Sequence, residues 1–212
     1  MAAAHTLAAQ GLSPGSSSNL SARVGEHVAI TATGAHMATL TVEQVCIVTP
    51  EGALVDGELA PTSELELHLG VYRASPAGAV VHTHSIAATT LSLVIDELPV
   101  VHYEQLLLGG SVRVAPFAVF GTPALAANVR AALEGRKAAI MANHGTVAWG
   151  LDLADAVRCA LLLEWVSTLY LGARAIGEPK TLSVEQQQGV IEQAMRIGYG
   201  ATHHARAKQG AS

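Results

Sequence analysis

The chain of 212 residues is poor in cysteine, in charged residues and in aromatic residues. It has 2 cysteines, and only 14% of its residues are charged and 4% aromatic. Cys46 and Cys159 lie far apart in apolar surroundings, so a disulfide framework and a zinc knuckle are both excluded. We expect two small buried side chains in a reducing, cytoplasmic setting.

Positive charge is scarce as well. The 12 lysines and arginines are outnumbered by 17 acidic residues, which gives a formal net charge of −5, and no cluster of basic residues occurs along the chain. This balance argues against nucleic acid and against an anionic membrane surface as the main partner.

Long apolar runs are also missing, although 50% of the residues are hydrophobic. No stretch reaches the length of roughly 18 apolar residues that a membrane span needs, and the N-terminus lacks the basic region of a signal peptide. We therefore expect one soluble domain over residues 1–212, in which 183–212 form a C-terminal helix and a mobile tail.

Strand-like and helix-like segments alternate along the chain, after a loop-like cluster at 13–23. This order predicts an α/β fold of three layers, α/β/α, around a central mixed or antiparallel sheet. Strands are expected at 27–33, 45–50, 77–85, 98–110 and 112–122, and two more within 137–150. Helices are expected at 61–75, 86–95, 123–136, 151–177 and 183–200.

Three histidines stand out because each follows an apolar run. His82 and His84, in "AVVHTHS", lie two residues apart, and side chains at that spacing in a strand point to one face. His144, in "MANHG", precedes a glycine that permits a tight turn. Three neutral imidazoles with one carboxylate suit Zn²⁺ or a similar first-row ion. The alternative is that they are polar strand-end residues bonded to loop backbone.

Several turn and helix-start positions carry hydroxyl or amide groups, namely Asn19, Thr33, Gly34, Thr62 and Ser63. Such groups can bind a phosphate monoester where no lysine or arginine cluster is provided. Each of them alone is equally well explained as a capping or turn residue.

The order and spacing of the motifs resemble the class II aldolase/adducin family over roughly residues 10–200. The resemblance rests on "SSNLSAR" (17–23), "ITATGAHM" (30–37), "PTSELELH" (61–68), "AVVHTHS" (79–85), "VVHYEQLLLGG" (100–110), "VAPFAVFGT" (114–122) and "MANHGTVAWG" (141–150).

The resemblance implies a role for each site residue. His82, His84 and His144 match the permanent zinc ligands, and Glu64 matches the carboxylate that binds the resting metal and then acts as acid and base. Tyr103 matches a proton donor that reaches in from a neighbouring subunit. The positions that match the phosphate site are Asn19, Thr33, Gly34, Thr62 and Ser63.

The implied enzyme is a zinc-dependent aldolase that acts as a homo-oligomer, and in the family as a homotetramer. It would cleave a ketose 1-phosphate, with L-fuculose 1-phosphate as the first candidate, to dihydroxyacetone phosphate and L-lactaldehyde. A lysine Schiff base is not expected, because Lys137, Lys180 and Lys208 lie outside the motifs.

Several alternatives stay open at this point. One is an aldolase for 5-deoxyribulose or methylthioribulose 1-phosphate; others are a sugar-phosphate epimerase, a dehydratase or a decarboxylase of the same family. An adducin-like interaction module is disfavoured because every expected ligand is present, and Glu64 disfavours the epimerases, which resemble this chain but carry aspartate there. Ser18 departs from the family's usual glycine, and Tyr199 is the weakest match, to a C-terminal segment that closes over substrate.

Overall fold

The computed structural model describes residues 1–199, and its centre is one large sheet. Nine strands lie in the order β4-β3-β2-β1-β5-β9-β8-β7-β6, and every neighbouring pair is antiparallel except β7 and β8. The strands are β1 (Asn19–Val24), β2 (His27–Thr31), β3 (Val45–Val48), β4 (Leu54–Asp56), β5 (Ala79–Thr83), β6 (Glu97–Leu98), β7 (Val112–Ala115), β8 (Ala138–Met141) and β9 (Gly145–Gly150).

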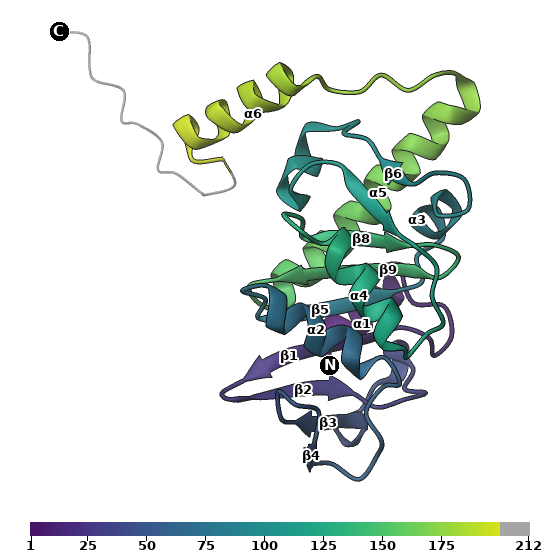
Figure 1. Ribbon diagram of the computed structural model, residues 1–212, viewed down its shortest axis with the longest axis vertical. Coiled ribbons are helices and arrows are strands. Elements are labelled where there is room, and N and C mark those ends of the chain that lie inside the picture. Colours follow the sequence, from purple (N-terminus) through teal and green to yellow (C-terminus); the bar gives the residue numbers. More distant parts are fainter. Residues whose placement is uncertain (200–212) are drawn as a thin grey trace, which may run out of the picture.

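Helices cover both faces of this sheet, which confirms the predicted α/β/α layers (Figure 1). One face carries α1 (Ala2–Ala9), α3 (Ile86–Leu91) and α5 (Leu153–Ile176), and the other carries α2 (Leu65–Ala74) and α4 (Pro123–Ala132). The last helix, α6 (Val184–Ile197), lies apart from the sheet and contacts the 3₁₀ helix η3 (Tyr103–Leu108). The predicted tail beyond Tyr199 lies outside the described residues.

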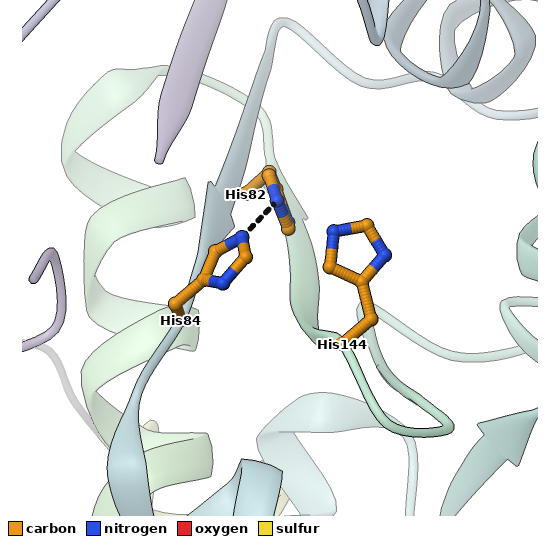
Figure 2. Close-up of side chains that lie close together, drawn as sticks. All are labelled: His82, His84 and His144. Atoms are coloured by element: carbon orange, nitrogen blue, oxygen red, sulfur yellow. Dashed lines mark hydrogen bonds between the residues drawn. The ribbon is translucent and has the colours of Figure 1, made fainter. Parts of the chain in front are cut away.

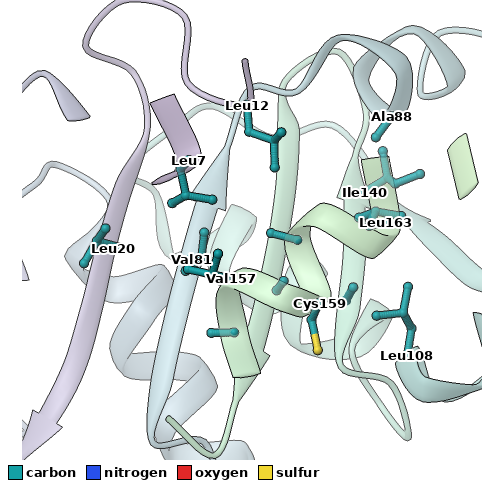
Figure 3. Close-up of a cluster of buried hydrophobic side chains, with 14 of the residues drawn as sticks. Leu7, Leu12, Leu20, Val81, Ala88, Leu108, Ile140, Val157, Cys159 and Leu163 are labelled. Carbon is teal, nitrogen blue, oxygen red and sulfur yellow. The ribbon is translucent and has the colours of Figure 1, made fainter. Parts of the chain in front are cut away.

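Apolar side chains form a separate core on each face. Leu163 and Cys159 of α5 pack with Val81 and Ile140 of the sheet, beside Leu7 of α1 (Figure 3). The opposite core joins α2 and α4 to the other face of the same strands. Alternation along β5 sends Val81 to the first core and Val80 to the second, so His82 faces the α2 side.

Helix α5 is the one described helix that is long and apolar enough to cross a membrane by length and composition alone. A core helix can meet the same criterion, and α5 packs along β9 and β5.

Three sequence-based assignments are wrong in detail. The Ser-rich stretch predicted as a loop contains β1, which pairs with β2 on one side and β5 on the other. The strand predicted at 98–110 is mainly η3, in which the Gln105 side chain donates to the Pro99 carbonyl and accepts from the Val101 N–H. The strand predicted at 112–122 stops at Ala115, because Pro116 cannot donate a ladder hydrogen bond.

Candidate active site

The three histidines meet at one end of the central strands. His82 is the fourth residue of β5, His84 follows the end of that strand, and His144 lies in the turn between β8 and β9 (Figure 2). Their ring centroids are 4.7 to 5.0 Å apart, and one nitrogen from each ring lies within 4.8 Å of the others. The structure therefore brings together the three histidines that the motifs singled out.

The turn that carries His144 fits closely against β5. Asn143 takes the positive φ of 56°, and its N–H donates to the Ser92 hydroxyl. Gly145 is needed for a different reason, because a Cβ there would lie 2.3 Å from the Thr83 carbonyl oxygen. The glycine that the sequence analysis linked to a tight turn thus allows close approach of two strands.

The backbone fixes the tautomer of His82. Its Nδ1 lies 2.9 Å from the Thr146 carbonyl oxygen, which can only accept, so Nδ1 carries the proton when the ring is neutral. Nε2 then presents a lone pair to the site, 2.9 Å from Nε2 of His84. A backbone carbonyl behind the ring is the usual device for orienting a metal-binding imidazole.

Glu64 lies against the same histidines, at the N-cap of α2 rather than in its first turn, and is buried. Its Oε2 is 3.0 Å from Nε2 of His82 and accepts a 3.0 Å hydrogen bond from the Asn19 amide. Its Oε1 is buried, has no hydrogen-bond partner among residues 1–199, and is 3.5 Å from Nε2 of His144.

The charge balance of the site favours an ionised carboxylate. Burial alone would raise the pKa of Glu64, but the charge and hydrogen bond of His82, with the Asn19 amide, lower it to about 2. Burial lowers the pKa of His84 to about 4, helped by the charges of His82 and His144, and it also lowers the pKa of His144. Near neutral pH, Glu64 is therefore anionic while His84 and His144 keep free lone pairs.

This donor set fits a divalent cation. Without a proton or a cation between them, the lone pairs of neutral His82 and ionised Glu64 would face each other at 3.0 Å. Three imidazole nitrogens and one carboxylate are a common ligand set for Zn²⁺, and the orphaned Oε1 supplies an additional donor atom.

The predicted phosphate residues open into the same cavity, which has a volume of about 530 Å³. The predicted residues that line it are Asn19, Thr33, Gly34, Thr62, Ser63, Glu64, His84 and His144. The Asn19 amide is already bonded to Glu64, which leaves one of its two N–H groups for other partners.

Sequence reasoning missed part of the lining. The 117–120 loop forms one wall, and its Phe117 and Phe120 side chains are 64% and 65% exposed. Ser18, noted in the sequence only for replacing the family's usual glycine, also lines the cavity, and its buried hydroxyl has no hydrogen-bond partner in the described part of the chain. The available signal for the loop was Pro116, which ends the strand before these aromatic residues.

Tyr103 does not line this cavity. It lies on η3, is 41% exposed, and its hydroxyl is 3.1 Å from that of Tyr199. Both hydroxyls also contact Glu104, and the hydrogen bond with Tyr103 raises the pKa of Tyr199 to about 12. The structure thus groups the two predicted tyrosines with each other and away from the histidines of their own chain.

Comparison with known proteins identifies the family. Residues 1–171 match the family described as "Class II Aldolase and Adducin N-terminal domain". The chain belongs to the class II aldolase family. It is 34% identical over 201 residues to the 5-methylthioribulose-1-phosphate/5-deoxyribulose-1-phosphate aldolase of Rhodospirillum rubrum. The aligned residues make up 94% of this chain and 90% of that protein.

The chain is also similar to L-fuculose phosphate aldolases of the same family. The L-fuculose phosphate aldolase of Escherichia coli is 35% identical over 191 residues, covering 89% of this chain and 88% of that protein. A solved structure of an L-fuculose 1-phosphate aldolase superposes with a TM-score of 0.86 and 32% identity, covering 91% of this chain and 92% of that one.

Proposed function

We propose that this class II aldolase uses zinc to cleave a ketose 1-phosphate reversibly to dihydroxyacetone phosphate and an aldehyde. The observation that carries the proposal is the cluster of His82, His84, His144 and Glu64, which opens into the same cavity as the hydroxyl groups of Thr33, Thr62 and Ser63. Class II aldolases use a divalent metal and act on phosphorylated sugars, and this cavity offers groups suited to both.

His82, His84 and His144 would hold the metal, and Glu64 would complete its resting ligand set. When bound, the cation supplies the Lewis acidity that stabilises negative charge developing at the ketose carbonyl as the carbon–carbon bond breaks. Zn²⁺ is the first candidate because three neutral imidazoles and a carboxylate suit it.

The chain's own groups would bind the phosphate and move the protons. The hydroxyls of Thr33, Thr62 and Ser63, with the remaining N–H of Asn19 and the backbone at Gly34, would hold the phosphate. The Ser18 hydroxyl, which has no hydrogen-bond partner within the described residues, lines the same cavity and supports an additional contact there.

In the cleavage direction the bond between C3 and C4 of the ketose breaks. The C4 hydroxyl loses its proton and becomes the aldehyde carbonyl, while the electron pair of the broken bond stays with the dihydroxyacetone phosphate fragment. That fragment takes a proton at C3, and Glu64, buried and ionised beside the histidines, is placed to carry it.

The second proton transfer, at the aldehyde oxygen, requires another group. We assign it to Tyr103 of a neighbouring copy in a homotetramer, because Tyr103 is exposed and lies outside its own chain's cavity. Phe117, Val119 and Phe120 expose apolar surface at the cavity mouth, which supports a subunit contact there. Tyr199, bonded to Tyr103, would reach the same region.

Three ketose 1-phosphates lead the candidate substrates. L-fuculose 1-phosphate, which gives L-lactaldehyde, is favoured by the resemblance to the solved L-fuculose 1-phosphate aldolase. A 5-deoxyribulose or methylthioribulose 1-phosphate is favoured by the relative from Rhodospirillum rubrum, which is similar over nearly the whole chain.

A cytoplasmic location is part of the proposal and is supported by two buried free cysteines.

A panel assay tests this proposal. Purified protein would be given the three ketose 1-phosphates separately, and release of dihydroxyacetone phosphate would be followed with a coupled reductase. Release from at least one of them is expected, and the highest kcat/KM identifies the aldehyde side of the substrate. No release from any of them by metal-loaded protein would contradict the proposal.

A further inference from the structure

A chain of hydrogen bonds runs from the interior of the protein to Glu64. The Tyr72 hydroxyl lies 2.8 Å from the Ser21 hydroxyl, which lies 2.7 Å from Nδ1 of His68. Nε2 of His68 lies 2.5 Å from Oδ1 of Asn19, whose Nδ2 donates to Glu64 at 3.0 Å. Every side chain in it is at most 6% exposed, and His68 and Ser21 are fully buried.

The direction of each hydrogen bond follows from the ionised end. The Glu64 carboxylate can only accept, so Asn19 turns its NH₂ group toward it and its oxygen toward His68. That oxygen requires a proton on Nε2 of His68. A neutral ring then accepts at Nδ1 from Ser21, whose oxygen accepts in turn from Tyr72.

The ring of His68 is neutral at ordinary pH. Burial, with the nearby charge of His82, lowers the pKa of His68 to about 3. The far end of the chain is also anchored, because the Arg23 guanidinium lies 4.7 Å from the centre of the Tyr72 ring and donates to the Tyr72 carbonyl. The network therefore has one arrangement in which each of its members is satisfied.

We propose that His68 is a positioning residue for Glu64, acting through the amide of Asn19. The inference rests on the proposed function, in which Glu64 is both a resting metal ligand and the acid/base group. Holding Oε2 with the Asn19 N–H fixes the side-chain conformation of Glu64 and leaves Oε1 free toward His144. His68 does not itself line the cavity, and its ring is linked to the Glu64 carboxylate through the Asn19 amide, so its effect on that carboxylate is indirect.

Two substitutions separate this role from simple packing. The amide of His68→Asn can occupy the place of Nδ1 and keep the contact with Ser21, but it cannot reach Asn19. The longer His68→Gln can put an N–H where Nε2 lies and restore the bond to Asn19. Leu163→Ala, in the core on the other face of the sheet, is the control for a general loss of stability.

Zinc affinity, measured by competition with a chelator, and steady-state cleavage would be compared among these variants. We expect His68→Asn to lose about 10- to 100-fold in zinc affinity and in kcat, with KM for the ketose phosphate little changed. His68→Gln should recover most of both losses, and Leu163→Ala should show neither. The zinc measurement does not require cleavage, so it tests the inference even where the proposed substrates fail.

Three other results would contradict a positioning role of His68. Equal losses in His68→Gln and His68→Asn, or a loss confined to KM, would contradict a role through Asn19. The ¹⁵N chemical shifts of the His68 ring, recorded on the intact protein near neutral pH, should show a proton on Nε2. A proton on Nδ1 would reverse the network and overturn the inference even where a variant fails to fold.

Discussion

At the scale of single residues, burial and hydrogen bonding decide which groups of the site carry charge. Glu64 stays ionised inside the protein because His82 and the Asn19 amide offset the cost of its burial. His68 is fully buried, and it stays neutral because burial and the charge of His82 outweigh the opposing charge of Glu64. Opposite protonation behaviour in neighbouring groups follows from these contacts.

The buried neutral state of His68 predicts a pH dependence of stability. The ordinary pKa of histidine is about 6.5, and in the folded protein the pKa of His68 is about 3. Between these values the unfolded chain binds a proton that the folded chain does not. The contribution to stability is therefore complete above the higher value and is lost as the pH falls toward the lower one.

Replacing His68 by glutamine removes the group that binds this proton in the unfolded chain. In chelator-treated protein, we expect the free energy of unfolding of His68→Gln to depend less steeply on pH within this window, by up to about 1.4 kcal/mol per pH unit. Urea unfolding at several pH values measures it, and the contributions of His84 and His144 cancel in the comparison. Parallel pH profiles of the two proteins would show that folding does not lower the pKa of His68, and would contradict its buried neutral state.

At the scale of elements, the site depends on the close contact between β5 and the turn between β8 and β9. A Cβ added at Gly145 would lie 2.3 Å from the Thr83 carbonyl oxygen and 3.3 Å from Cε1 of the His82 ring. Any larger side chain must separate the turn from the strand, and the turn carries His144. Metal binding and local packing are therefore coupled at this position.

The substitution Gly145→Ala tests that coupling. We expect it to lower the free energy of unfolding by about 1–3 kcal/mol and to weaken metal binding, measured by chelator competition. The matched control is Gly172→Ala in α5, where an added Cβ meets no atom of the described residues within 4 Å. That control should stabilise the helix by about 0.5–1 kcal/mol, and a tolerated Gly145→Ala would refute the close approach.

The elements also show what sequence reasoning can and cannot supply. Helices α2 to α6 and the strand that carries His82 were predictable because local periodicity and capping residues mark them, whereas α1 was not among the expected helices. Strand β1 was not, because its Ser-rich approach reads as a loop and pairing with β2 and β5 overrides local preference.

At the site, too, sequence reasoning reaches the residues within motifs but not the contacts that pairing between distant segments creates. His82, His84, His144 and Glu64 lie in recognisable motifs, so their grouping could be predicted. The hydrogen bond of Ser21 to His68 joins positions 47 apart in sequence, and only the pairing of strands and helices brings them together. The 117–120 loop was missed because its apolar residues suggest a buried strand, whereas they are exposed at the cavity mouth.

At the scale of the whole molecule, the assignment of Tyr103 that we propose takes groups from two chains into each site. Tyr103 lies on η3, which contacts α6, and its hydroxyl is bonded to that of Tyr199; the cavity is lined by residues from other parts of the fold. Helix α6 lies apart from the sheet, and its Val184, Met195 and Ile197 side chains are exposed. These features favour an assembly in which neighbouring copies share each site.

Subunit mixing tests this sharing. Glu64→Gln and Tyr103→Phe should each lower kcat by about 100-fold or more, for loss of different proton transfers. When equal amounts of the two variants are dissociated and reassembled together, the mixture should regain about a quarter of the wild-type rate. One site in four then has both an intact Glu64 and an intact Tyr103. A mixture that stays at the mean of the two variants would place both groups in the same chain.

The measurement that bears most directly on the central claim is the metal dependence of dihydroxyacetone phosphate release. One sample of the protein would be assayed as purified, after removal of metal by a chelator, and after addition of Zn²⁺, with His144→Ala carried through in parallel. The account predicts that release is lost on chelation and returns with zinc in the wild-type protein, and that it does not return in the variant. Release that persists without metal, or that zinc restores equally in His144→Ala, would contradict it.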